Sequence, residues 1–317
     1  WYQKQSFEKA FLGPQMLQRD KDVLKSWIES LTKVAKLSGW DCKDRPKAGL
    51  IDTVVEELWT KFHPKLPPYF EYFIGIENKI KQLEPLLDIG LDDVRFVGIW
   101  GLPGVGKTTI ARAVFDKYRS QFDISCFLLN VRATSLERDG EVHLQSKLLS
   151  HLKIKNMEIE DTFEGKEIIQ NRFRDKKVLF ILDDVSHTRH LEILANNPNW
   201  YGAGSRVIIT TRDSRLLRRV HEVHAHEVEI MNPHESFQLF CSKAFKNGEP
   251  SEDLLHVSKA VCEYAKGLPL ALSVLGSFMR GRSSVLEWED ALDKLKKHQP
   301  DEILGVLQLS FDALDEP

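Results

Sequence analysis

The chain contains 317 residues, which is enough for two or three domains. Hydrophobic residues make up 42% of it and charged residues 29%, as in ordinary water-soluble globular proteins. The formal net charge of −3 gives no overall reason to expect binding to nucleic acid or to a membrane surface. No apolar run approaches the roughly 20 residues that a membrane-spanning helix needs.

The first part of the chain, residues 1–62, predicts helices without strands. Apolar residues such as Val23, Trp27 and Leu31 recur at helical spacing, and a second helical pattern follows Pro46. No strand is present for these helices to cover, so we interpret 1–62 as the C-terminal end of a domain. The proline-rich residues 63–72 predict a linker. Because the sequence starts at a tryptophan and stops within a helical pattern, both ends are interpreted as cuts in a longer protein.

Strands and helices are expected to alternate from residue 73 to residue 227. The strand-like runs are short and almost wholly apolar, as parallel strands buried on both faces are, and lie at 94–100, 125–131, 177–183 and 205–211. Helical patterns lie between them at 108–122, 141–152 and 165–175. This alternation predicts an α/β fold with a parallel sheet and right-handed crossovers.

The strand signal fades after residue 227. Four helical patterns follow, at 232–245, 252–267, 269–281 and 285–298. They predict a small helical domain over 228–299. Residues 300–317 are expected to open a third unit.

Neither the cysteines nor the clustered histidines predict a metal site. Cys42, Cys126, Cys241 and Cys262 lie far apart and are interpreted as buried thiols. His221, His224 and His226 match no standard zinc spacing, and one edge strand explains them.

A phosphate-binding loop follows the first strand. Residues 101–108, Gly-Leu-Pro-Gly-Val-Gly-Lys-Thr, fit the pattern G-x-x-x-x-G-K-[ST] between a buried strand and a helix. The glycines let the backbone wrap phosphates and point its N–H groups inward, and the helix N-terminus adds partial positive charge. We expect Lys107 to bridge the β- and γ-phosphates and the Thr108 hydroxyl to coordinate Mg²⁺. The alternative is a glycine-rich turn that binds nothing.

Two acids end the third predicted strand. In P-loop enzymes the acid at this position holds Mg²⁺, and a second acid can polarise an attacking water. Asp183 and Asp184 therefore suit those two roles. The alternative is a helix cap at a strand exit, which is common for aspartate. Their position downstream of a P-loop lysine favours the metal interpretation.

The fourth strand ends in Thr210, Thr211 and Arg212. A guanidinium beside the phosphate pocket can register whether a γ-phosphate is present. The alternative is a surface arginine in a loop between strand and helix. The residues alone favour neither.

The motifs taken together resemble a known family. The segment KGLPLALSVLGSFM at 266–279 follows GLPGVGKTT, LFILDDV and GSRVIITTRD, and this series resembles the NB-ARC domain of plant disease-resistance receptors. Residues 73–77 resemble the first motif of that family, and 127–132 resemble a TIR-type variant of another. The helices of 1–62 resemble the C-terminal end of a TIR domain. The resemblance covers essentially the whole chain and points to the TIR-NB-ARC-LRR (NLR) class of receptors.

This resemblance implies a fold and a function. The fold is a P-loop NTPase of the STAND type, with a parallel sheet flanked by helices over 73–227. A helical bundle similar to ARC1 follows over 228–299, and the start of a winged-helix domain similar to ARC2 over 300–317. The implied function is that of an ADP/ATP-binding switch in an intracellular immune receptor. Nucleotide exchange would drive domain rearrangement and oligomerisation in defence signalling.

The resemblance also implies which residues bind the phosphates and Mg²⁺. Asp183 and Thr108 would hold Mg²⁺, and Asp184 would assist hydrolysis. The phosphates would be bound by the loop and the first helical turn, namely Gly101, Gly104, Val105, Gly106, Lys107, Thr108 and Thr109.

Four further contacts with the nucleotide are implied. Arg212 would sense the γ-phosphate, and Pro269 would contact the nucleotide from the helical domain. The backbone around Ile74 and Gly75 would touch adenine. One departure from the family pattern is Pro103, which stands where many members have glycine and which supplies no backbone N–H.

The implied cofactors are ADP or ATP with Mg²⁺, and the implied enzymatic activity is at most a slow Mg²⁺-dependent ATPase. The NAD-cleaving glutamate of a TIR domain would lie upstream of Trp1, and the leucine-rich repeats beyond Pro317. A pathogen effector or a guarded host protein would bind through regions outside this chain. Self-association is expected on activation, without a nucleic-acid partner. The expected location is the cytoplasm, with the nucleus as a second compartment.

Two other functions compete with the switch. One is an active P-loop ATPase or small-molecule kinase, although no lid domain or substrate-binding acid cluster is evident. The other is a STAND-type transcription regulator, although no complete DNA-binding module is evident in these residues.

Overall fold

The computed structural model describes residues 73–152, 159–195, 197–220, 222–282 and 284–298. The chain divides into two compact units, Trp1–Trp59 and Thr60–Pro317, and every described residue belongs to the second. The predictions for 1–62, 63–72 and 300–317 lie outside the described residues, as does the one for His221.

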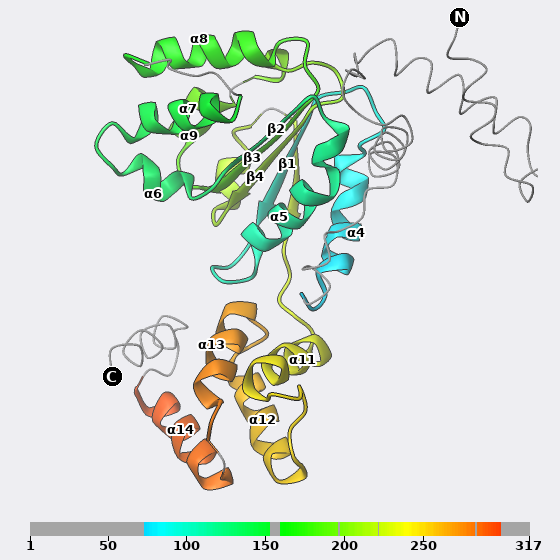
Figure 1. Ribbon diagram of the computed structural model, residues 1–317, viewed down its shortest axis with the longest axis vertical. Helices are drawn as coiled ribbons and strands as arrows, with labels where there is room; N and C mark the ends of the chain where they lie inside the picture. The colour runs from blue at the N-terminus through cyan, green and yellow to red at the C-terminus, as the bar shows by residue number, and fades with distance from the viewer. Residues whose placement is uncertain (1–72, 153–158, 196, 221, 283, 299–317) are drawn as a thin grey trace, which may run out of the picture. The chain divides into compact units, whose positions relative to one another are not determined.

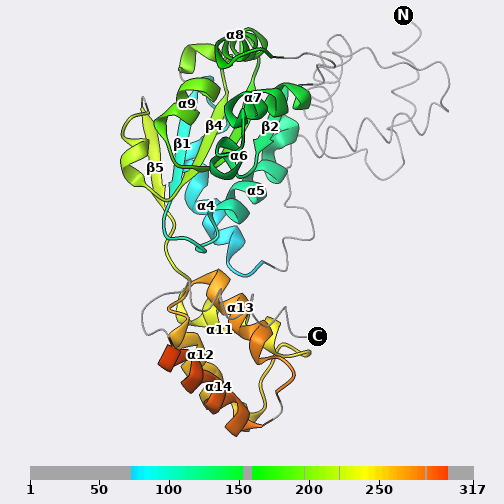
Figure 2. The same cartoon turned by 90° about the vertical axis from the view of Figure 1, so that its left-hand side faces the viewer.

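A five-stranded sheet stands at the centre of the first part of the described chain (Figures 1 and 2). Its strands are β1 (Arg95–Trp100), β2 (Ile124–Leu128), β3 (Val178–Val185), β4 (Arg206–Thr211) and β5 (Val223–Glu227). They lie in the order β2-β3-β4-β1-β5, and every neighbouring pair is parallel. The predicted parallel sheet is therefore confirmed, and β5 is the predicted edge strand that carries His224 and His226.

Helices cover both faces of the sheet. Alternate strand residues point to opposite faces, so both faces carry apolar side chains that helices can bury. On one face, Val97 and Ile99 of β1 belong to a core shared with α4 (Ile76–Leu87) and α5 (Lys107–Tyr118). On the other face, Phe96 belongs to a core shared with three further helices, α7 (Gly140–His151), α8 (Thr162–Phe173) and α9 (Thr188–Leu194). The remaining short elements are η2 (Arg119–Gln121), α6 (Val131–Ser135), η3 (Pro198–Trp200) and α10 (Ser214–Leu217).

Among the described residues, four helices follow β5, as predicted: α11 (Pro233–Ala244), α12 (Glu252–Tyr264), α13 (Pro269–Met279) and α14 (Val285–His298) (Figure 1). Asn232 and Glu235 form a capping box at the start of α11, where Pro233 suits the first turn. Phe240 of α11 and Trp288 of α14 are almost fully buried and pack edge to face, with their ring centroids 5.9 Å apart. No helix among the described residues combines the length and apolar composition that crossing a bilayer requires.

Two strands end at a different residue than predicted, and both ends lie at the carboxyl edge of the parallel sheet. The strand expected over 125–131 already ends at Leu128, because Asn130 has a left-handed backbone (φ 55°) and begins α6. The strand expected over 177–183 continues to Val185, with a register shift between Leu182 and Val185. The first prediction was too long by three residues and the second too short by two.

Candidate nucleotide-binding site

The loop between β1 and α5 has the backbone geometry that its glycines permit. Gly104 and Gly106 have φ values of 78° and 97°, in the left-handed region where a side chain is strained. Gly106 also precedes α5 without giving it a side-chain cap. The first N–H groups of α5 therefore face the loop and suit an anion.

Lys107 lies inside this loop with 8% of its surface exposed. Its ammonium donates hydrogen bonds of 2.9 Å to the carbonyl oxygens of Gly101 and Leu102. Burial lowers the pKa of Lys107, and the nearby Arg212 guanidinium lowers it further. An anion in the loop would offset both effects by favouring the charged ammonium.

The first acid, Asp183, is fully buried directly beneath α5. Its Oδ1 accepts hydrogen bonds from the hydroxyls of Thr108 (2.8 Å) and Thr210 (2.7 Å). Its Oδ2 is buried and has no hydrogen-bond partner among the described residues. A carboxylate and a hydroxyl side by side are the oxygen donors that Mg²⁺ prefers, so Thr108 and Asp183 fit that ion.

The second acid, Asp184, lies between two arginines. Its Oδ2 is 2.9 Å from Nε of Arg132, which belongs to α6, and its Oδ1 is 3.3 Å from Nε of Arg212, which follows β4. Asp184 itself has φ 56°, and its N–H donates a 2.8 Å hydrogen bond to the Thr210 hydroxyl. The Thr210 oxygen thus contacts both acids.

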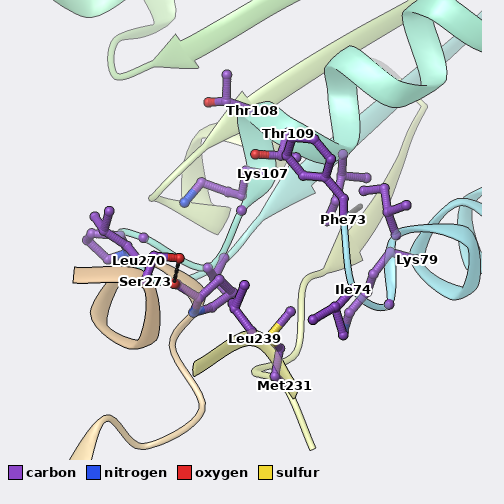
Figure 3. A pocket seen from close by; sticks show the side chains of 18 of the residues that line it. Phe73, Ile74, Lys79, Lys107, Thr108, Thr109, Met231, Leu239, Leu270 and Ser273 are labelled. Atoms are coloured by element: carbon purple, nitrogen blue, oxygen red, sulfur yellow. Dashed lines mark hydrogen bonds between the residues drawn. The ribbon is translucent and has the colours of Figure 1, made fainter. Parts of the chain in front are cut away.

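These features surround one cavity of about 500 Å³. Figure 3 shows Lys107, Thr108 and Thr109 above it, with Phe73 and Ile74 on one side and Leu270 on the other. All but two of the site residues predicted from the sequence line the cavity: Ile74, Gly75, Gly104, Val105, Gly106, Lys107, Thr108, Thr109, Asp184, Arg212 and Pro269. Gly101 and Asp183 do not line it, and each contacts a residue that does.

The cavity wall also contains residues that the sequence did not single out. Some are polar or charged and come from separate elements, namely Lys79, Asn130, Thr210, Glu235, Lys243 and Ser273. Others are apolar, namely Phe73, Met231 and Leu239, and Figure 3 shows Met231 and Leu239 on the side of the cavity opposite Thr108 and Thr109. An apolar end opposite a cationic loop suits a ligand with a flat ring at one end and phosphates at the other.

The helices after β5 contact the loop directly. Pro269 begins α13, and the N–H of Leu270 donates a 3.2 Å hydrogen bond to the carbonyl oxygen of Gly104. A Cβ atom on Gly104 would lie 3.0 Å from Cβ of Leu270. A glycine at this position thus allows the close approach of α13.

At the apolar end, Gly75 precedes α4 with φ 74°. A Cβ atom there would lie 2.7 Å from Oε1 of Glu235, which belongs to α11. Gly75 therefore lets the chain before α4 come close to this carboxylate.

The parallel sheet, the phosphate loop at its edge and the buried acid beside Thr108 together define a P-loop nucleotide-binding domain. The chain belongs to the NB-ARC family, since the model of the NB-ARC domain matches residues 76–249. The resemblance inferred from the motifs is thereby confirmed, and so is the predicted α/β fold with a parallel sheet. Curated proteins similar to this chain are plant disease-resistance proteins.

Similar proteins cover almost the whole chain. TMV resistance protein N from Nicotiana glutinosa is 38% identical over 99% of this chain and 28% of its own length. Probable disease resistance protein RPP1 from Arabidopsis thaliana is 35% identical over 93% of this chain and 25% of its own length. The chain therefore spans about a quarter of the length of these curated relatives. Among solved structures, a STAND protein with a tetratricopeptide repeat sensor from Pyrococcus horikoshii aligns with a TM-score of 0.40, at 19% identity over 71% of this chain and 35% of that one.

Proposed function

We propose that this chain is an ADP/ATP-binding switch of an intracellular plant immune receptor. The observation that carries the proposal is the hydrogen bond from Leu270 of α13 to Gly104 in the phosphate loop, at the wall of the cavity. A nucleotide in this cavity contacts the sheet and the helices after it at once. Its phosphates can therefore bias the position of one part against the other.

We assign a role to each residue of the phosphate site from the charge that it carries. Lys107 and the N–H groups at the start of α5 bind the phosphates. Thr108 and Asp183 hold Mg²⁺, which neutralises phosphate charge when it is bound. Arg212 lines the cavity and contacts a terminal phosphate. Ile74, Gly75 and the apolar residues near them receive the adenine ring.

Slow hydrolysis follows from the environment of Asp184. A general base must be free to accept a proton from water. Arg132, which does not line the cavity, is 2.9 Å from one oxygen of Asp184, and this contact remains when Arg212 contacts a phosphate. A site of this kind binds ATP for longer than an efficient ATPase does, and this favours a switch over the alternative of a high-turnover enzyme.

We propose the division of the chain from its sequence motifs. Residues 73–227 form the P-loop domain and 228–299 the ARC1-like helical domain. Residues 1–62 are the end of a TIR domain, 63–72 a linker and 300–317 the start of an ARC2-like domain. Recognition of an effector or guarded protein, and oligomerisation on activation, belong to the whole receptor inside the cell.

The direct test is to identify the nucleotide that the chain carries. The purified folded chain is denatured and its supernatant is separated by ion-exchange chromatography. We expect ADP to be released, or added ADP to bind to chain that carries none. A folded sample that neither contains nucleotide nor binds ADP would refute the proposal. Turnover of many ATP molecules per minute at saturating Mg²⁺ would favour the ATPase instead.

Replacing Asp183 with asparagine is expected to remove the effect of Mg²⁺ on ATP affinity. The asparagine Oδ1 can still accept from Thr108 and Thr210, and its amide replaces the oxygen that has no partner. The fold is thus kept while a metal ligand is lost. We expect the ratio of ATP affinities with and without Mg²⁺ to fall about tenfold, by analogy with other losses at metal sites. Titration calorimetry with Mg²⁺ and with a chelator measures this ratio, and an unchanged ratio would contradict the assignment.

A further inference from the structure

Two arginines share the carboxylate of Asp184, but they do so unequally. Arg132 lies behind the carboxylate, does not line the cavity, and makes the shorter contact at 2.9 Å. Arg212 lines the cavity and makes the longer contact at 3.3 Å. Only Arg212 therefore lies where a ligand in the cavity can draw it away from Asp184.

The backbone of Asp184 is held in place, and this restrains how far its carboxylate can move with Arg212. Asp184 has a left-handed backbone at the register shift of β3, and its N–H is bonded to the Thr210 hydroxyl. Its side chain is also largely buried, with 17% exposed. Departure of Arg212 would leave a fixed, partly buried negative charge, and this charge is unfavourable unless another cation stays beside it.

We propose that Arg132 is a positioning residue that keeps Asp184 paired, so that Arg212 can transfer to the terminal phosphate of bound ATP. This inference rests on the proposed function as an adenine-nucleotide switch. Without Arg132, Asp184 holds Arg212 with its full charge and competes with the terminal phosphate. ADP lacks that phosphate and does not require the transfer. Arg132 thus sets how strongly the site prefers ATP to ADP.

The test compares ATP and ADP affinities of Arg132→Gln with those of the unchanged chain. We expect ATP affinity to fall about tenfold and ADP affinity to change less than about twofold, because only ATP competes with Asp184 for Arg212. Arg132→Lys keeps a positive charge at this position and is expected to restore most of the ATP preference. Titration calorimetry with Mg²⁺ gives both affinities, and thermal unfolding reports whether each variant is folded.

Arg138→Gln is the matched control, because Arg138 is 97% exposed and its loss removes the same charge from a position after α6. It is expected to leave the ratio of ATP to ADP affinity unchanged. The double variant Arg132→Gln/Asp184→Asn tests the mechanism, since without the carboxylate nothing competes for Arg212. Its affinity ratio should equal that of Asp184→Asn alone.

The outcomes separate this inference from the proposed function. Equal losses of ATP and ADP affinity in Arg132→Gln, or no loss at all, would overturn the positioning role while nucleotide binding stands. A selective loss that persists in the double variant would also overturn it. If Arg132→Gln does not fold, Arg132→Met is compared with Arg138→Met. A selective loss of ATP affinity in Arg132→Met supports the positioning role, and its absence overturns it. Failure of the unchanged chain to bind either nucleotide would refute the proposed function itself.

Discussion

Lys107→Ala is expected to abolish detectable binding of both ADP and ATP. The ammonium is buried in the phosphate loop, where two carbonyl oxygens orient it. Removing one partner of such a buried charge pair typically costs about 2–5 kcal/mol, which corresponds to about a thirtyfold to several-thousandfold loss of affinity. Titration calorimetry and the nucleotide content of the purified chain both measure this loss.

A control must show whether the loss of affinity comes from the change in net charge or from the loss of the Lys107 ammonium in the phosphate loop. Lys81 is an exposed lysine of α4, and Lys81→Ala makes the same truncation and the same change in net charge. Its affinities should stay within about twofold of those of the unchanged chain, because an exposed charge is screened by solvent. Binding by Lys107→Ala that matches Lys81→Ala would place the phosphates elsewhere.

Arg206→Met is expected to lower the free energy of unfolding by about 3–5 kcal/mol, because several backbone carbonyl oxygens lose a charged donor and each buried polar group left unsatisfied costs about 1–3 kcal/mol. The Arg206 side chain has no exposed surface, and its ion pair with Asp93 spans 3.0 Å. Its guanidinium also donates to backbone carbonyl oxygens at the end of α4 and in the loop after it, those of Leu87, Asp88, Leu91 and Asp93, and to that of the preceding residue, Ser205. Methionine fills much of the volume but leaves these acceptors without their donor.

Arg95→Met provides the comparison for this substitution. Arg95 is paired with Arg206 in the sheet and also contacts Asp93, but its side chain is partly exposed. Loss of a solvent-accessible ion pair typically costs about 1 kcal/mol or less. Thermal and urea unfolding of the two variants should therefore differ clearly. Similar destabilisation by both would show that water takes over the carbonyl oxygens that Arg206 now binds.

The sequence predicted the phosphate loop, the order of the elements and the two acids, because these features depend on local spacing. A strand, three glycines and a lysine before a helix specify one local geometry, and Lys107 lies where that geometry requires. The four apolar runs likewise indicated strands, because burial on both faces leaves few polar positions in them.

The contacts of Arg132 and Arg206 could not be predicted in this way. Arg132 reaches Asp184 only because β2 lies beside β3, and that neighbour relation depends on how the crossovers are arranged. Arg206 stands in a run that indicated a buried strand, and only the position of the α4 C-terminus explains why a cation is buried there. The left-handed turn at Asn130 also escaped prediction, since an isolated asparagine after an apolar run does not specify the end of a strand.

The register shift in β3 has a consequence for the two neighbouring acids. In a regular strand, consecutive side chains point to opposite faces. From Leu182 to Val185, however, β3 advances three residues while β4 advances two, from Ile209 to Thr211. The extra residue places both Asp183 and Asp184 at the carboxyl edge of the sheet, where each has different neighbours. Because of this one inserted residue, two aspartate side chains next to each other in the sequence take different roles. Asp183 is left to bind a metal ion, and Asp184 contacts a pair of arginines.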